Sequence, residues 1–171
     1  MALEHALLVS LREHPAGGLE LARRFDKSIG IFWAATHQQI YKVLHRMADD
    51  GWIEATTDAA RTTYAVTPAG EKVLADWIAQ PTAYERQRNE LAVKMRAASY
   101  GDRRQLLAQI TERIAEHRTR LAHYDYLEAR DFPQPESLHE QHLDQYLVMR
   151  GGKLMEQFWI TWLTEYLEAH S

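Results

Sequence analysis

The sequence predicts a mainly α-helical protein with a small β-wing: a winged helix-turn-helix domain over residues 1–81, followed by a three-helix domain over residues 82–171. An amphipathic helical segment over residues 37–50 leads at once into two β-rich segments, which is the first observation behind this prediction. The second is that β-type patterning stops after Pro81, whereas helical patterning continues to the end of the chain.

Two short helices come first. Their apolar residues recur at helical spacing, and Pro15, Gly17 and Gly18 separate them. The apolar positions expected in the core are Leu3, Leu7, Leu8 and Leu11 in the first helix, and Leu19, Leu21, Ala22 and Phe25 in the second. We expect the apolar run Ile31, Phe32 and Trp33 to pack against the third helix and fix its angle, and we expect Trp77 and Ile78 to be core residues as well.

The third helix is expected over residues 37–50. Thr36 can cap its start and Gly51 can end it, because glycine adopts the left-handed conformation without strain. One face carries Ile40, Val43, Leu44 and Met47, and would dock on the preceding helix. The opposite face carries groups that can hydrogen-bond base edges or phosphates: His37, Gln38, Gln39, Tyr41, Lys42 and His45. This segment alone is equally consistent with an ordinary amphipathic helix.

The hairpin strengthens the DNA-binding interpretation. Residues 52–57 and 62–67 are rich in β-branched and aromatic residues around a short polar loop, and Thr67-Pro68 starts the next helix. We expect further DNA contacts from Thr36, Lys27, Ser28, Arg46 and Arg61. The net charge of −4 is unusual for a DNA-binding protein, so the basic groups must cluster locally, with Glu4, Glu54, Asp58 and Glu71 lying elsewhere.

Three helices are expected after Pro81, over about residues 84–100, 103–130 and 138–169. Asp102 with Gln105, and Ser137 with Glu140, have capping-box spacing. The middle helix has the apolar spacing of a coiled coil, with its seam at Leu107, Ile110, Ile114, His117, Leu121, Tyr124 and Glu128.

The last helix is apolar on nearly every side of its later turns, so we expect a second copy of the chain to cover it. Gly151 and Gly152 indicate a kink or a close approach between helices. The residues expected at this homodimer interface are Leu147, Leu154, Phe158, Trp159, Trp162, Leu163 and Tyr166.

Several function classes are not indicated. The chain has no cysteine, and it shows no phosphate loop, nucleophile motif or dinucleotide fingerprint, so no catalytic residue or cofactor is predicted. His139 and His142 are three apart and do not form the zinc-protease pattern, so no metal site is predicted. No signal peptide or membrane-spanning run is found, which favours a cytoplasmic protein without membrane contact.

The chain resembles the PadR-like transcriptional regulators, in the subgroup whose long helical C-terminal domain is of the virulence-activator type. The resemblance rests on Leu3–Leu11 (LEHALLVSL), Leu19–Trp33, Thr36–Glu54 (THQQIYKVLHRMADDGWIE), Tyr64–Gly70 (YAVTPAG) and Leu74–Pro81 (LADWIAQP). It extends more loosely to the C-terminus. Where the family's wing usually carries Gly-Arg-Pro and further basic residues, this chain keeps Arg61 alone.

The resemblance implies a homodimeric repressor that binds a double-stranded DNA operator and is released by a small aromatic effector. Residues with suitable chemistry for the effector, if they are not simply dimer core, are Tyr100, His117, Tyr124, Tyr146, Met149 and Arg150. The alternative is a helical dimer that binds protein and whose winged domain no longer reads an operator, which the acidic balance and the reduced wing would favour.

Overall fold

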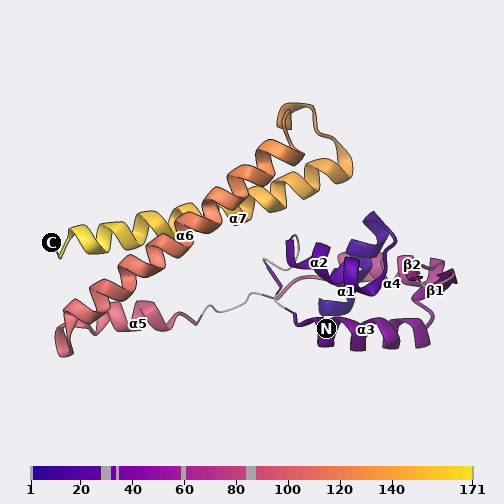
Figure 1. Cartoon of the computed structure of the whole chain (residues 1–171), viewed down its shortest axis with the longest axis horizontal. Helices are drawn as coiled ribbons and strands as arrows, with labels where there is room; N and C mark the ends of the chain where they lie inside the picture. Colours follow the sequence, from indigo (N-terminus) through magenta and orange to yellow (C-terminus); the bar gives the residue numbers. More distant parts are fainter. Residues whose placement is uncertain (1, 28–31, 34, 59–60, 84–87, 171) are drawn as a thin grey trace. The chain divides into compact units, whose positions relative to one another are not determined.

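The computed structural model describes residues 2–27, 32–33, 35–58, 61–83 and 88–170, and its contacts divide the chain into two compact units, residues 1–84 and 85–171. Each unit is considered by itself. The first contains α1 (Ala2–Glu13), α2 (Gly18–Lys27), α3 (His37–Asp49), β1 (Ile53–Asp58), β2 (Arg61–Val66) and α4 (Pro68–Ile78). This is the predicted winged helix-turn-helix order (Figure 1).

The core of the first unit lies between α1, α2 and α3. Leucines of α1 and α2 pack with Phe25, Ile40, Leu44 and Met47, all of them fully enclosed. Burying each such side chain contributes about 1.5–3 kcal/mol, so this cluster holds the three helices together. Among the core positions predicted in α1 and α2, Leu19 is exposed and Leu3 is only partly buried.

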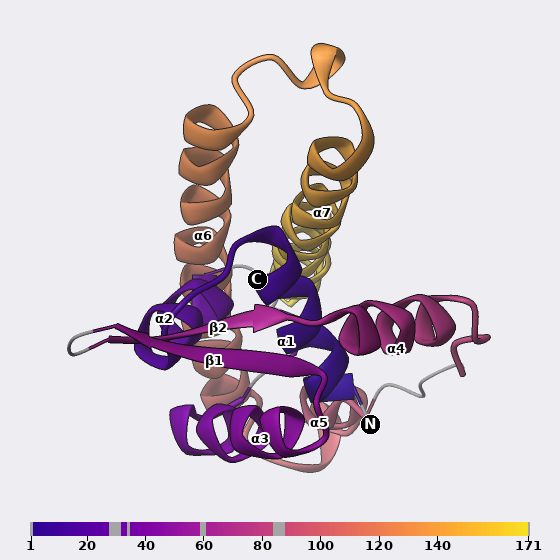
Figure 2. The ribbon, with the colours of Figure 1, turned by 90° about the vertical axis from the view of Figure 1, so that its right-hand side faces the viewer.

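The two strands form an antiparallel hairpin that pairs Ile53 with Val66 at its base (Figure 2). Its base also carries a bridge from Ala16, which exchanges backbone hydrogen bonds with Tyr64. Thr67 caps α4 by accepting from the Gly70 N–H at 3.2 Å, as the Thr67-Pro68 pair predicted. The wing is therefore joined to both the α1–α2 turn and the start of α4.

Four large side chains expected in the core are more exposed than predicted. Phe32 and Trp33 in the turn before α3, and Trp77 and Ile78 at the end of α4, all lie at the surface. Trp77 stacks on His5 of α1 at a centroid distance of 4.5 Å, which explains its position without full burial. Ile31 lies outside the described residues.

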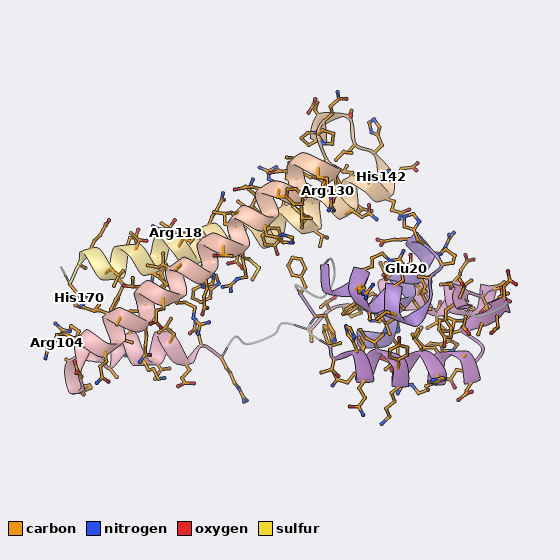
Figure 3. All side chains as sticks on the ribbon, in the orientation of Figure 1. Glu20, Arg104, Arg118, Arg130, His142 and His170 are labelled. Carbon is orange, nitrogen blue, oxygen red and sulfur yellow. The ribbon has the colours of Figure 1, made fainter. Side chains whose placement is uncertain are left out.

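The second unit contains α5 (Glu90–Arg96), the 3-10 turn η2 (Ala98–Tyr100), α6 (Arg103–Asp131), the 3-10 turn η3 (Pro135–Ser137) and α7 (Glu140–Glu168). The helices α6 and α7 run side by side in opposite directions. Arg130 marks the end of the pair next to the connecting turn, and Arg104 and His170 mark the other end (Figure 3).

Details of this unit differ from the sequence prediction. The first helix begins at Glu90 and ends at Arg96, followed by a 3-10 turn, rather than running unbroken to Tyr100. In α6 the buried residues include Leu106 and Leu127, so Leu106 takes the seam position expected for Leu107. Ser137 does not cap α7; its hydroxyl donates to the Gln134 carbonyl within η3, and the helix starts after His139 without a side-chain cap.

At Gly152 the helix α7 packs tightly against α6. A Cβ atom built there would lie 2.2 Å from the Tyr124 hydroxyl oxygen and 2.6 Å from Cζ of the same ring. The neighbouring Gly151 faces open space. The close approach predicted from the glycine pair is therefore confirmed at Gly152. In the described part of the chain, no helix is long and apolar enough to cross a membrane.

Candidate nucleic-acid interface

A complete capping box fixes the start of α3. The Thr36 hydroxyl accepts from the Gln39 N–H at 3.2 Å, and the Gln39 side-chain oxygen accepts from the Thr36 N–H at 2.8 Å. The Thr36 hydroxyl also lies 3.2 Å from that oxygen. Both residues were predicted to contact DNA, and the structure uses their side chains to set the helix start. This local network orients the first turn of α3.

The outer face of α3 carries the remaining polar side chains predicted from the sequence. Ile40, Leu44 and Met47 are buried against the first unit's core, so the opposite face is open to solvent. No acidic residue occupies the first turn, where the exposed backbone N–H groups favour anions. The side chains exposed here are His37, Gln38, Tyr41, Lys42 and His45, which we call the α3 outer face.

Tyr41 is held in place by the start of α2. A Cβ atom at Gly18 would lie 2.4 Å from Cε1 of the Tyr41 ring, so the ring covers that glycine. The residue as a whole is 37% exposed. Tyr41 therefore connects α2 to α3 and keeps part of its ring at the α3 outer face.

Arg46 lies at the edge of this face and forms an ion pair. Its guanidinium donates to the Glu4 carboxylate of α1, and the Glu4 side chain is only 5% exposed whereas that of Arg46 is 47% exposed. The prediction that Glu4 lies away from the basic groups is wrong. Sequence reasoning missed this pair because 42 positions separate its members and no local pattern links them.

The wing offers few cations in the described part of the chain. Ser28 lies outside the described residues, as do the side chains of Lys27 and Arg61, so these three predicted contacts stay predictions. The described side chains of the wing tip are threonines and Asp58, with the Thr57 and Thr62 hydroxyls 3.1 Å apart. Asp58 stands opposite Arg61 in the strand register.

The face of α7 turned away from α6 is apolar and exposed. Its residues recur at helical spacing around Gly151, and each is roughly half exposed. We call this set the α7 apolar face: Leu147, Val148, Leu154, Met155 and Phe158. Trp159 and Trp162 border it. Phe158 meets Trp159 edge-to-face at a centroid distance of 5.5 Å and stacks on Trp162 at 6.0 Å.

Two predicted interface residues contact other elements of the second unit. Leu163 is 0% exposed and packs with Ile110 and Ile114 of α6. The Tyr166 hydroxyl donates to the Met95 carbonyl of α5 at 2.9 Å. Leu163 is enclosed by α5, η2 and α6, contrary to the prediction, whereas Tyr166 is partly buried and its place in an interface stays a prediction.

The residues predicted for an effector differ in their exposure. Tyr100 is 91% exposed, whereas Tyr124 is buried. Tyr146 is buried as well and donates to Glu128 at 3.2 Å. Met149 is partly buried, and Arg150 is exposed. An effector could reach Tyr100 and Arg150 from solvent, whereas Tyr124 and Tyr146 are enclosed between α6 and α7, so the effector residues stay a prediction.

A buried polar cluster surrounds His117 between α6 and α7. His117 Nδ1 lies 2.5 Å from a Glu156 oxygen and 2.8 Å from an Arg120 nitrogen, while the Arg120 Nε donates to Glu156 at 3.1 Å. The His117 ring also stacks on Trp159. Glu156, Arg120 and Trp159 therefore account for the placement of His117.

Tyr124 lies near the same cluster. Burial, with the nearby Glu156 carboxylate, raises the pKa of Tyr124 above its usual value.

A second ionic group ties the two helices near Gly152. Lys153 donates to Asp125 at 2.8 Å and to Glu128, and these hydrogen bonds raise the Lys153 pKa. Opposite charges favour the protonated amine more than burial disfavours it. Among the described residues, no three His, Asp or Glu side chains are grouped so that they could hold a metal ion.

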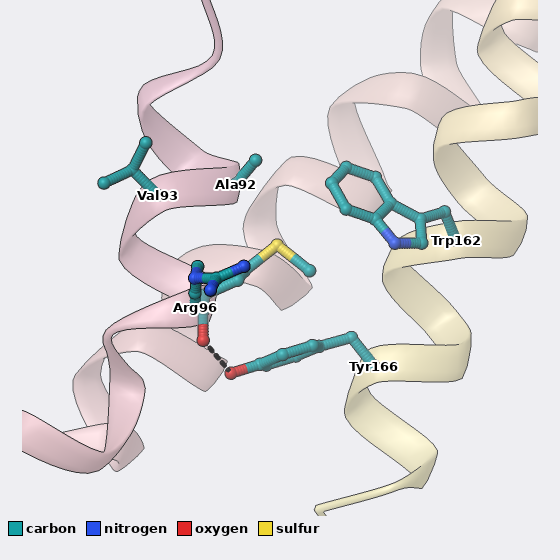
Figure 4. A pocket seen from close by; sticks show the side chains of 6 residues that line it. Ala92, Val93, Arg96, Trp162 and Tyr166 are labelled. Carbon is teal, nitrogen blue, oxygen red and sulfur yellow. Dashed lines mark hydrogen bonds between the residues drawn. The ribbon is translucent and has the colours of Figure 1, made fainter.

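An open depression of about 490 Å³ lies between α5 and α7 (Figure 4). Ala92, Val93 and Arg96 come from α5, whereas Trp162 and Tyr166 come from α7. The depression is wide open to solvent, so the structure offers no enclosed cavity there for a small molecule.

Two family models match the chain: "Transcriptional regulator PadR-like family" over residues 7–76, and "Virulence activator alpha C-term" over residues 87–171. The chain is 44% identical to the "Probable transcriptional regulator Rv1176c" of Mycobacterium tuberculosis, over 99% of this chain and 97% of that protein. It is 34% identical to the Vibrio cholerae virulence activator AphA, whose structure matches with a TM-score of 0.82 over 98% of this chain and 96% of that one.

A third relative is the "Negative transcriptional regulator PadR" of Bacillus subtilis, 26% identical over 96% of this chain and 95% of that protein. Its structure in complex with operator DNA matches the whole of both chains with a TM-score of 0.85 at 23% identity. Its structure with p-coumaric acid matches with a TM-score of 0.81 at 25% identity, over 99% of this chain and 98% of that one.

The fold, the two family models and the nearly complete coverage of these relatives agree with one another. The chain belongs to the PadR-like family of transcriptional regulators, which are not enzymes.

Proposed function

We propose that this regulator binds a specific DNA operator as a homodimer, represses transcription, and releases DNA when a small aromatic molecule binds. The first unit would bind DNA, and the second would dimerise and receive the effector. The observation that carries the DNA part is the α3 outer face, which combines Gln38, Lys42 and two histidines on a rigidly capped helix without an acid in its first turn. Such a helix suits the major groove.

The α7 apolar face supports the homodimer. Contiguous exposed apolar surface is typical of protein interfaces, and the large side chains of this face recur at intervals of seven and four residues, which suits packing against a second copy of the helix. A two-fold dimer would also present two α3 helices to two half-sites of an operator.

The test of DNA binding starts from an unbiased selection of duplexes from a random library, followed by titration of two variants. Lys42→Ala should weaken binding to all duplexes and reduce the salt slope by about 1, because one phosphate contact is lost. Gln38→Ala should relax preference at one base position by about 1–3 kcal/mol.

Lys72→Ala is the matched control for Lys42→Ala, because Lys72 is an exposed lysine of the same unit that pairs with Asp76 on α4. It should leave affinity and salt slope unchanged. If wild-type protein binds no duplex or heparin at low ionic strength, the second candidate function is favoured: a helical dimer that binds protein. The observation that favours this second function is the wing, which has Arg61 as its single basic residue and so offers few phosphate contacts.

The dimer is tested by sedimentation at micromolar concentration. Phe158→Glu places a charge in the α7 apolar face and should produce monomers, whereas Tyr126→Glu on α6 should not. The two side chains are equally exposed, 58% and 59%, so the comparison separates a specific interface from general loss of apolar surface. A wild-type monomer would contradict the homodimer.

Effector release is supported by the Bacillus subtilis relative, which was solved with p-coumaric acid. Phenolic acids titrated against the DNA complex should release DNA while tryptophan fluorescence changes. A ligand shifts this equilibrium only by its different affinity for the two states. Binding that leaves DNA retention unaltered would remove the release mechanism.

A further inference from the structure

We infer that Glu4 acts as a positioning residue that holds Arg46 of α3 and withholds its positive charge from DNA phosphates. This inference rests on the proposed DNA binding and adds a residue of α1 to it. Lys42 and Arg46 lie one turn apart on α3. If Glu4 holds Arg46, only Lys42 is left to contact the phosphate backbone.

The geometry supports a lasting pair. Glu4 lies in the first turn of α1, its side chain is 5% exposed, and it accepts from the Arg46 guanidinium. A carboxylate this deeply buried strongly favours a cationic partner, because an unpaired buried charge is costly. Moving Arg46 to a phosphate would leave Glu4 buried and alone.

The position of Arg46 means that this ion pair lowers the positive charge beside the α3 outer face. Arg46 follows Lys42 by four residues, so the two side chains lie on neighbouring turns of the same side of α3. Arg46 remains 47% exposed, so its outer part is within reach of solvent at the edge of the α3 outer face. Without Glu4, this side would carry two unneutralised cations instead of one.

The pair also links α3 to α1. It joins the last turn of α3 to the first turn of α1, while the buried stripe of α3 fills the core between them. The apolar packing positions α3 on α1, and the ion pair adds one directional contact at the edge of that packing. Glu4 therefore acts on DNA through α3 and touches no DNA itself.

The experiment measures binding of the full-length protein to a mixed-sequence duplex, as the slope of log K against log salt concentration. Each phosphate contact contributes about 0.9 to this slope for double-stranded DNA. The informative variant is the double change Glu4→Leu with Arg46→Met, which replaces the ion pair by apolar side chains and leaves no unpaired buried charge. We expect it to keep the wild-type slope.

Glu4→Gln tests the other half of the inference. The amide keeps the size of the side chain and can still accept from Arg46, but it no longer neutralises it. We expect tighter binding to the duplex and a slope steeper by up to about 0.9 for each recognition helix engaged. Adding Arg46→Gln to this variant should return the slope to the wild-type value.

Two results would overturn the inference: a double Glu4→Leu, Arg46→Met variant whose slope falls as that of Lys42→Ala does, or a Glu4→Gln variant with unchanged affinity and slope. The first would make Arg46 a phosphate contact. Far-ultraviolet circular dichroism identifies a variant that fails to fold, and the remaining variant then decides. Loss of DNA binding in the wild type would instead refute the proposed function, so the two failures are distinguishable.

Discussion

Replacing Gly152 by alanine separates helix propensity from packing between α6 and α7. In an open helical position this change stabilises a protein by about 0.8–1 kcal/mol, because glycine has the greater backbone freedom to lose. At Gly152 the new Cβ would lie 2.2 Å from the Tyr124 hydroxyl oxygen and 3.0 Å from Cε1, well inside van der Waals contact. Tyr124 is only 2% exposed, so its ring has little room to move away.

Gly151 provides the matched comparison, since it is the preceding residue of the same helix and a Cβ there would meet no atom within 4 Å among the described residues. Overpacking a well-packed site costs about 1–3 kcal/mol. We therefore expect Gly151→Ala to stabilise by about 1 kcal/mol, and Gly152→Ala to be less stable than Gly151→Ala by about 1–3 kcal/mol. The difference between the two variants isolates the packing penalty.

The assay is urea unfolding followed by circular dichroism at one protein concentration, with self-association checked by sedimentation. Equal stabilisation by both substitutions would refute the reasoning, because it would mean that Tyr124 does not press against α7. A weakened dimer in Gly151→Ala alone would place Gly151 in the proposed interface and would leave the Gly152 result intact.

Three further outcomes are expected. Gly70→Ala should destabilise the first unit by more than about 1 kcal/mol, since the Cβ would lie 2.1 Å from the Trp52 carbonyl oxygen, which belongs to the backbone and cannot rotate away; thermal unfolding measures it. Thr36→Ala should cost about 1 kcal/mol through loss of the cap with Gln39, and an unchanged melting temperature would contradict the role of the capping box. Tyr124→Phe should leave stability at neutral pH unchanged or raise it by about 1 kcal/mol, because the hydroxyl is buried without a partner among the described residues. Burial raises the Tyr124 pKa, so the folded protein holds the hydroxyl proton more tightly than the unfolded chain does. The stability that depends on this protonated hydroxyl is fully present below about pH 10 and is lost as the pH rises through the folded-state pKa. Tyr124→Phe should therefore flatten the fall of stability above about pH 10, and an identical alkaline profile would count against this assignment.

The features that the sequence predicted well depend on short-range chemistry. The cap at Thr36, the end of α3 before Gly51 and the start of α4 at Pro68 each follow from residues a few positions apart, and the structure confirms them. Helix-forming patterns are read over one or two turns, so such boundaries are accessible from one sequence.

The features that were missed depend on contacts between distant segments. Leu106 rather than Leu107 faces the core because the position of α7, and not the local spacing, decides which side of α6 is covered. The same holds for Leu163, which α6 encloses. Ser137 had the spacing of a cap, but Pro135 lies at the start of a 3-10 turn that uses the serine hydroxyl first.

Thr67 joins three elements through a single side chain and its own N–H. Its hydroxyl donates to the Gly51 carbonyl at 2.6 Å and accepts from Gly70, and its N–H donates to the Trp52 carbonyl at 3.0 Å. Hydrogen bonds of Thr67 thus connect the end of α3, the base of the wing and the first turn of α4. A substitution that removes the Thr67 hydroxyl would therefore loosen the end of α3, the base of the wing and the start of α4 together.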